Sequence, residues 1–142
     1  MINMVKRTGF YFLKIVALAI AYHLGARLGL MMAYVQPNTS PVWPSTGITI
    51  AALLIFGINL WPGILLGVVG GSLINNVPFL LALGMGVGNT LEAIVIVYCL
   101  SRLVRFNLTL NRVQDVLYLL IFSFLGTMIS ATIGSMTLML TG

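Results

Sequence analysis

The sequence predicts an all-α fold, a polytopic transmembrane bundle of about five helices, two of them short. The first observation is composition: of 142 residues, 60% are hydrophobic and 6% are charged, whereas a soluble domain carries about 25% charged residues. The second is three long apolar runs, each able to cross a bilayer. The third is a shorter apolar run that carries two Trp-Pro pairs. We therefore expect residues 1–142 to form one integral membrane domain.

The elements follow from the positions of the apolar runs and the polar turns between them. A basic head precedes the first span, which exceeds the roughly 20 residues needed for one crossing. The polar turn 36–40 ends that span, and the turn at 75–78 opens another long one. In order, the expected elements are a long span, two short helices and two further long spans: 10–35, 44–59, 62–75, 78–103 and 115–140.

A Trp-Pro pair stands at the start of each short helix: Trp43-Pro44 and Trp61-Pro62. Proline suits the first turn of a helix, where its missing N–H costs nothing. Tryptophan suits a bilayer interface, with its ring in apolar matter and its N–H near water. Helices of about 14–16 residues reach roughly 21–24 Å, short of the roughly 30 Å hydrocarbon core. They form either two thin spans, which we favour, or a re-entrant hairpin buried by protein.

The basic residues predict the orientation. They precede or enter the first span and cluster again before the last one: Lys6, Arg7, Lys14, Arg102, Arg105 and Arg112. The turns 36–42 and 75–78 carry no charge. Because cytoplasmic loops carry the excess of Lys and Arg, we expect a cytoplasmic N-terminus, a cytoplasmic loop at 102–112 and an external C-terminus. The net charge of +5 then reflects topology and contact with anionic lipid in the bilayer, not a nucleic-acid partner.

Small residues four positions apart recur in four segments, and they predict close helix packing. Gly63, Gly67 and Gly71 are the longest glycine series. The other series are Gly25 with Gly29, Gly84 with Gly88, and Gly126 with Ser130 and Gly134. Small residues at this spacing let helix backbones approach in lipid. We expect a packing framework formed by Trp43, Pro44, Gly47, Trp61, Pro62, Gly63, Gly67 and Gly88.

Glu92 is the sharpest candidate for a functional residue, because it lies near the centre of the span 78–103. A carboxylate there is costly unless it is paired or protonated. Asn89 lies almost one turn earlier, and His23 and Arg27 share a face of the first span at comparable depth. Either of these two could pair with Glu92. The four residues form either a polar cluster that fixes helix register or a site that senses a ligand or protons.

The outer rim is a second candidate site. Asn38, Trp43 and Ser45 lie close to Asn75 and Asn76 on the predicted outer side. Amides, hydroxyls and an aromatic ring together can bind a small ligand. The alternative is an ordinary polar loop with an interfacial tryptophan.

The residue types present argue against catalysis. One His, one Cys (Cys99) and two acidic residues provide no nucleophilic triad and no pair of carboxylates, and they make a poor metal-ligand set. We therefore expect a non-enzyme with no cofactor and no metal. Arg112 and Asp115 are expected to pair across one turn at the start of the last helix.

The chain resembles the first type of bacterial membrane-associated sensor domain, the MASE family. The resemblance is carried by Trp43-Pro44-Ser45-Thr46-Gly47, Leu60-Trp61-Pro62-Gly63-Ile64, Gly67 and Gly88-Asn89-Thr90-Leu91-Glu92. It implies an N-terminal sensory module of about eight helices. It also implies a cytoplasmic output domain: a diguanylate cyclase, a cyclic-di-GMP phosphodiesterase or a histidine kinase. Because this chain has about five helices and no output domain, we expect it to be the first half of such a module.

Three functional hypotheses follow. The leading one is a sensory input domain of the bacterial inner membrane, which detects a small-molecule or membrane stimulus and signals to a cytoplasmic output domain. The alternative is a small transporter or half-transporter completed as a homodimer, because short Pro- and Gly-interrupted helices beside a midplane carboxylate are typical of transporter sites. The third is a structural membrane subunit.

Overall fold

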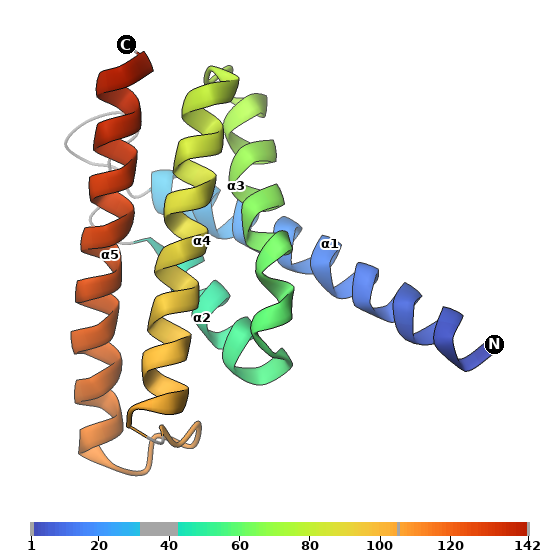
Figure 1. The fold of residues 1–142 in the computed structure, drawn as a ribbon, viewed down its shortest axis with the longest axis vertical. Coiled ribbons are helices and arrows are strands. Elements are labelled where there is room, and N and C mark those ends of the chain that lie inside the picture. Colours follow the sequence, from blue (N-terminus) through green and yellow to red (C-terminus); the bar gives the residue numbers. More distant parts are fainter. Residues whose placement is uncertain (1, 32–42, 105, 142) are drawn as a thin grey trace.

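The computed structural model describes residues 2–31, 43–104 and 106–141, and its regular structure there is entirely helical (Figure 1). The elements in order are α1 (Ile2–Met31), α2 (Pro44–Phe56), the short 3-10 helix η1 (Ile58–Leu60), α3 (Trp61–Ile74), α4 (Phe79–Arg102) and α5 (Val113–Thr141). The all-α prediction of about five helices, two of them short, is confirmed.

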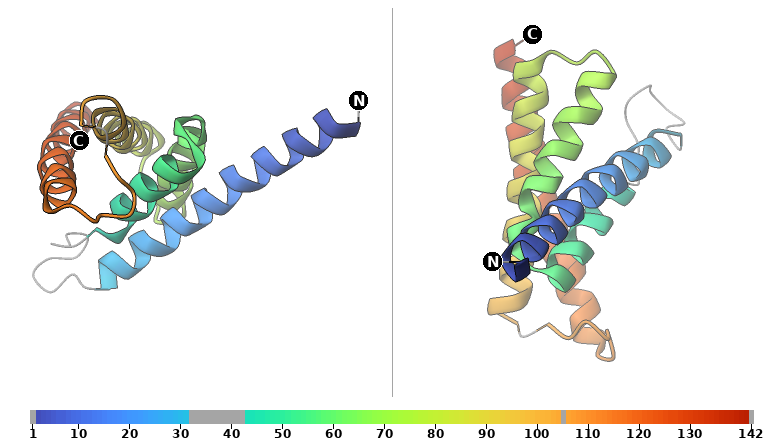
Figure 2. Two further views of the ribbon diagram at one scale, coloured as in Figure 1. Left: turned by 90° about the horizontal axis from the view of Figure 1, so that it is seen from below. Right: turned by 90° about the vertical axis from the view of Figure 1, so that its right-hand side faces the viewer.

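Three helices are long and apolar enough to cross a membrane: Gly9–Met31 within α1, then α4 and α5. Helices α3, α4 and α5 lie side by side and alternate in direction (Figure 1). The turn between α3 and α4 and the last turn of α5 are at one end of the bundle, and the loop between α4 and α5 is at the other. Helix α1 crosses this layer at a steep angle, and its N-terminal half extends beyond the other helices (Figures 1 and 2).

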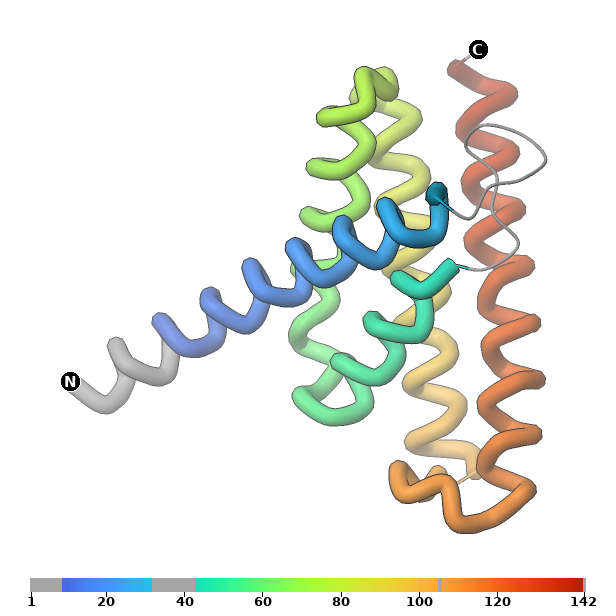
Figure 3. The backbone as a smooth tube through the Cα atoms, turned by 180° about the vertical axis from the view of Figure 1, so that it is seen from behind, coloured from blue at the N-terminus to red at the C-terminus, as the bar shows by residue number. Residues whose placement is uncertain are grey.

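Helix α2 is shorter than predicted because of Gly57. This glycine has a φ of 99°, a backbone conformation that glycine adopts without steric cost and other residues rarely adopt. It ends α2 at Phe56, before the expected 59, and η1 then turns the chain into α3. Pro44 and Pro62 each occupy the first turn of a helix, as predicted. Figure 3 shows α2 beside α1, with its first turn facing the middle of the layer formed by α4 and α5.

The glycine series of α3 forms its contact with α1. A Cβ atom added to Gly63 would lie 2.8 Å from the backbone oxygen of Ile15, and one added to Gly67 would lie 2.9 Å from that of Ala19. Any side chain larger than a hydrogen would therefore push the two backbones apart. The predicted close approach is confirmed here, and it lets α1 cross α3 with Leu18 buried between them.

Glycines form the α4–α5 contact as well. A Cβ on Gly88 would lie 3.3 Å from the backbone oxygen of Ser130, and one on Gly126 would meet Ile96. Gly47 differs from the expected packing framework, because no atom of the residues that the structure describes lies within 4 Å of the position of its Cβ. Gly47 is exposed, so it is not a close-packing residue. The reason is geometric: it lies on the face of α2 opposite the buried Ser45 and Thr49.

Candidate functional site

A chain of hydrogen bonds joins three helical segments in the interior. The indole N–H of Trp43, just before α2, donates to the Tyr22 hydroxyl of α1 at 3.4 Å. That hydroxyl donates to the side-chain oxygen of Asn89 in α4 at 3.1 Å. Asn89 in turn donates to the backbone oxygen of Met85 at 2.8 Å. We call Trp43, Tyr22 and Asn89 the polar chain. Because each member comes from a different segment, a shift of α1, α2 or α4 changes its geometry.

Ser45 fastens the first turn of α2 to α1. Its side chain is fully buried, and its hydroxyl donates to the backbone oxygen of Tyr22 at 2.9 Å. The space for this contact comes from Gly25, where a Cβ would lie 3.1 Å from the Ser45 hydroxyl oxygen. The start of α2 is therefore held against the same residue, Tyr22, that carries the polar chain.

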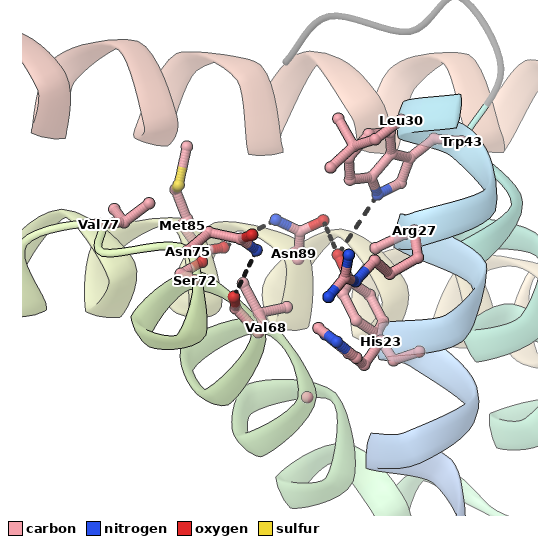
Figure 4. Close-up of a pocket in the computed structure, with 14 residues that line it drawn as sticks. His23, Arg27, Leu30, Trp43, Val68, Ser72, Asn75, Val77, Met85 and Asn89 are labelled. Atoms are coloured by element: carbon pink, nitrogen blue, oxygen red, sulfur yellow. Dashed lines mark hydrogen bonds between the residues drawn. The ribbon is translucent and has the colours of Figure 1, made fainter. Parts of the chain in front are cut away.

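One side of the polar chain borders a cavity of about 230 Å³ between α1, α3 and α4. We call it the first cavity. Its walls are formed by Tyr22, His23, Ala26, Arg27, Leu30, Trp43, Gly67, Val68, Gly71, Ser72, Asn75, Val77, Met85 and Asn89. Figure 4 shows His23 and Arg27 of α1 facing Asn75 and Asn89 across it. The absence of a side chain at Gly71 leaves space for the His23 imidazole, because a Cβ there would lie 2.6 Å from Nδ1 of His23.

The other side of the polar chain borders a second cavity of about 440 Å³, between the start of α2, α4 and α5. Trp43 and Asn89 line this cavity as well as the first, so the two cavities share a wall. Glu92 lies here with 3% of its surface exposed, and the Thr127 hydroxyl of α5 donates to its carboxylate at 3.0 Å.

The position of Glu92 corrects one expectation from the sequence. Its carboxylate contacts Thr127 of α5, not Arg27 or His23 of α1. The reason is the direction of the side chain on α4: Asn89 faces α1, whereas Glu92, three residues later, is separated from it by about 60° around the helix axis and faces α5. The polar residues expected to form one cluster are therefore divided between the two cavities, with Asn89 between them.

Trp43 lines both cavities together with Asn89, the eleventh residue of the 24-residue helix α4. It is therefore level with the middle of α4. The first turn of α2 starts inside the bundle, so α2 covers only part of its height. Asn75 shares the first cavity with Trp43, as the rim hypothesis required, while Asn38 lies outside the described residues.

Beyond the C-terminal end of α4, Asp115 contacts the backbone of the loop and not its expected partner Arg112. Asp115 has 4% of its surface exposed, and one of its carboxylate oxygens accepts the N–H of Asn107 at 3.4 Å. The loop before α5 folds back over the carboxylate, so a backbone donor takes the place of the arginine. Its other carboxylate oxygen is buried and has no hydrogen-bond partner among the described residues.

The sequence analysis did not identify Tyr22 or Thr127 as site residues. Tyr22 donates a hydrogen bond to Asn89, and Thr127 donates one to Glu92. A usable indication existed for Tyr22: a phenol hydroxyl in the middle of an apolar span needs a hydrogen-bond partner. Thr127 follows Gly126 of the predicted packing series, so it lies next to a close helix contact. Neither indication names the partner, because the partners come from distant helices.

The fold and these contacts define a polytopic helical membrane domain with a polar centre between two cavities. A family model, MASE1, matches residues 15–142. The chain belongs to the MASE1 family, which is a family of membrane-associated sensor domains and not of catalytic domains. None of the curated proteins compared with the chain matches it, and no solved structure matches it.

Proposed function

We propose that the chain is the signal-input domain of a bacterial signalling protein of the inner membrane, with its N-terminus in the cytoplasm. It detects a stimulus in the first cavity and passes it to a cytoplasmic output domain. The observation that carries this proposal is the polar chain, which joins α1, the start of α2 and α4 and forms the wall between two cavities. Membership of a sensor-domain family supports it.

The polar chain supplies a route from a cavity to a change in packing. A ligand shifts a conformational equilibrium only if it binds two packings with different affinity. A molecule in the first cavity contacts Asn89, Trp43 and residues of α1 and α3 at once, so its fit depends on how these elements lie relative to one another. Asn89 belongs to α4, which runs without a break to Arg102 and leads into the loop before α5.

The orientation is part of the proposal. The basic loop between α4 and α5 would face the cytoplasm, and the turn at 75–78, at the other end of the bundle (Figure 1), would face outward. Fusions to alkaline phosphatase and to green fluorescent protein after residues 76 and 108 test this. We expect phosphatase activity only at 76 and fluorescence only at 108. The reverse pattern would overturn the orientation.

The experiment on function uses the gene in its own bacterium, with Asn89→Leu in the chromosome and Asn59→Leu as the matched control. Asn59 is exposed in η1 and lines neither the first nor the second cavity. We expect Asn89→Leu to change intracellular cyclic-di-GMP or response-regulator phosphorylation and Asn59→Leu to leave both unchanged. If the Asn89→Leu protein accumulates normally and neither output changes, the sensory proposal is wrong.

One observation favours the transporter alternative. Helix α2 begins inside the bundle beside a cavity that holds the buried Glu92, and discontinuous helices at midplane sites are typical of transporters. Solute flux into proteoliposomes that contain the chain, abolished by Glu92→Gln, would establish this function in place of the sensory one.

A further inference from the structure

We propose that the first cavity binds a small organic monoanion with an apolar body, such as a short monocarboxylate, with Arg27 as its counter-ion. This inference rests on the proposed function, because it names the chemical class of the stimulus. It is carried by three features of the cavity: its unbalanced charge, its surplus of hydrogen-bond donors and its apolar walls.

The charge of the first cavity is not balanced by the protein. Arg27 lies on its wall with its side chain exposed, in the last part of the apolar span Gly9–Met31, where an anion beside the guanidinium is favourable. The chain has only two acidic residues. Glu92 lies in the second cavity and accepts from Thr127, and Asp115 accepts from the backbone beyond the far end of α4. Neither lines the first cavity, so no acidic side chain of the chain balances the charge of Arg27 there.

Among the described residues, each amide opposite Arg27 has one N–H donor without a protein acceptor. Each side-chain amide has two N–H donors. Asn89 uses one of them on the Met85 backbone oxygen, and Asn75 uses one on the Gly71 backbone oxygen at 2.8 Å. The side-chain oxygen of Asn89 already accepts from Tyr22. The second N–H of each amide, together with the guanidinium, suits an acceptor-rich carboxylate, which has several lone pairs to satisfy.

The remaining walls are apolar and set the size of the ligand. Between the polar groups lie Ala26, Leu30, Val68, Val77, Met85 and the ring of Trp43. The volume of about 230 Å³ is below the roughly 300–1,000 Å³ of drug-sized sites. A single guanidinium against aliphatic side chains matches one negative charge on a short apolar body. A multiply charged or sugar-like anion would leave polar groups unpaired against these walls.

Trp43 allows binding to be read directly. The chain has two tryptophans, and Trp61, which is 42% exposed at the start of α3, lines neither cavity. Trp61→Phe therefore leaves Trp43 as the single indole reporter. We would purify this variant of the full chain in dodecyl maltoside, a phosphate-free non-ionic detergent, and titrate it with hexanoate while following indole fluorescence. Hexanamide, which has the same body without the charge, is the matched ligand control.

We expect saturable quenching by hexanoate and none by hexanamide. Arg27→Gln should weaken hexanoate binding by at least about tenfold, which corresponds to about 1.4 kcal/mol, while Arg102→Gln removes the same charge outside the cavity and should leave binding unchanged. Equal responses to hexanoate and hexanamide, or no effect of Arg27→Gln, would overturn the proposal. If Arg27→Gln does not fold, Arg27→Met and Arg27→Lys provide the same comparison of charge.

A second pair of variants tests the location. Gly71→Ala places a methyl group against the His23 imidazole, which lines the cavity and must shift to accommodate it, whereas a Cβ at Gly70 meets no atom of the described residues within 4 Å. Only Gly71→Ala should weaken hexanoate binding. Adding phosphatidylglycerol distinguishes a lipid source of the anion: quenching by this lipid with none by hexanoate would overturn the free-carboxylate proposal. Binding without any change of output in cells would leave the ligand class standing and reject the sensory function.

Discussion

The contact between α1 and α3 gives a prediction whose size follows from two neighbouring glycines. In Gly67→Ala, the new methyl carbon would lie 2.9 Å from the Ala19 backbone oxygen and 2.9 Å from Cβ of Tyr22. The first of these is backbone, which cannot swing aside, so the helices must separate. Overpacking of this kind costs about 1–3 kcal/mol. The same change removes a glycine from a helix interior, which stabilises by about 1 kcal/mol.

Gly70→Ala isolates the steric part. Gly70 is in the same helix, and no atom lies within 4 Å of the position of its Cβ. Both variants gain the same helix propensity, so the difference between them is the overpacking cost of about 1–3 kcal/mol. We expect Gly70→Ala to raise the free energy of unfolding by about 1 kcal/mol. The free energy of unfolding of Gly67→Ala should be lower than that of Gly70→Ala by the overpacking cost. The assay is reversible unfolding in mixed detergent and SDS micelles, followed by circular dichroism.

Two outcomes would refute this reasoning. If both alanine variants were stabilised equally, α1 and α3 would not approach each other as described. If both were destabilised equally, the loss would come from glycine in the helix and not from the contact. Because Tyr22 carries the polar chain and contacts Gly67, Gly67→Ala should also shift the Trp43 emission, while Gly70→Ala should not.

Three further predictions concern the polar centre. Thr127→Val should cost about 0.5–1.5 kcal/mol, because it removes one hydroxyl donor from the Glu92 carboxylate while the Ser130 hydroxyl remains beside it. Thr132→Val loses only a bond to its own helix and should be nearly neutral, so equal losses in chemical denaturation would contradict the Glu92 contact. Glu92→Gln should lower the melting temperature little, since no buried cation loses its partner, and a large loss would point to a cation at Glu92. Tyr22→Phe should cost about 0.5–1.5 kcal/mol for each bond broken and shift the Trp43 emission; an unchanged spectrum would argue against the bond from the indole.

Much of the helical framework could be predicted from the residues, because the bilayer leaves few alternatives. A span of apolar residues must satisfy its own backbone, so the apolar runs predict the helices, and the glycine spacing predicts which faces approach. The bounds were wrong at two places: α1 begins at Ile2, before the expected 10, and α2 ends early because of the backbone conformation of Gly57. The candidate site was less predictable. The residue types were found, but Glu92 was expected beside Arg27 and His23 and lies against α5.

The sequence by itself determined that this is a helical membrane protein with polar residues at a few depths in its spans. Hydrophobicity and the 3.6-residue period are local properties, and they need no knowledge of neighbouring helices. Only the tertiary structure decided which polar residues meet. The partners Tyr22 and Asn89 are 67 residues apart, and Glu92 and Thr127 are 35 apart. Their meeting depends on the crossing angle of α1 and on the rotation of α4 about its axis. The close contacts at the glycine faces of α3, α4 and α5 fix these angles. The two cavities and their shared wall form between helices that are distant in the sequence, so they depend on these contacts.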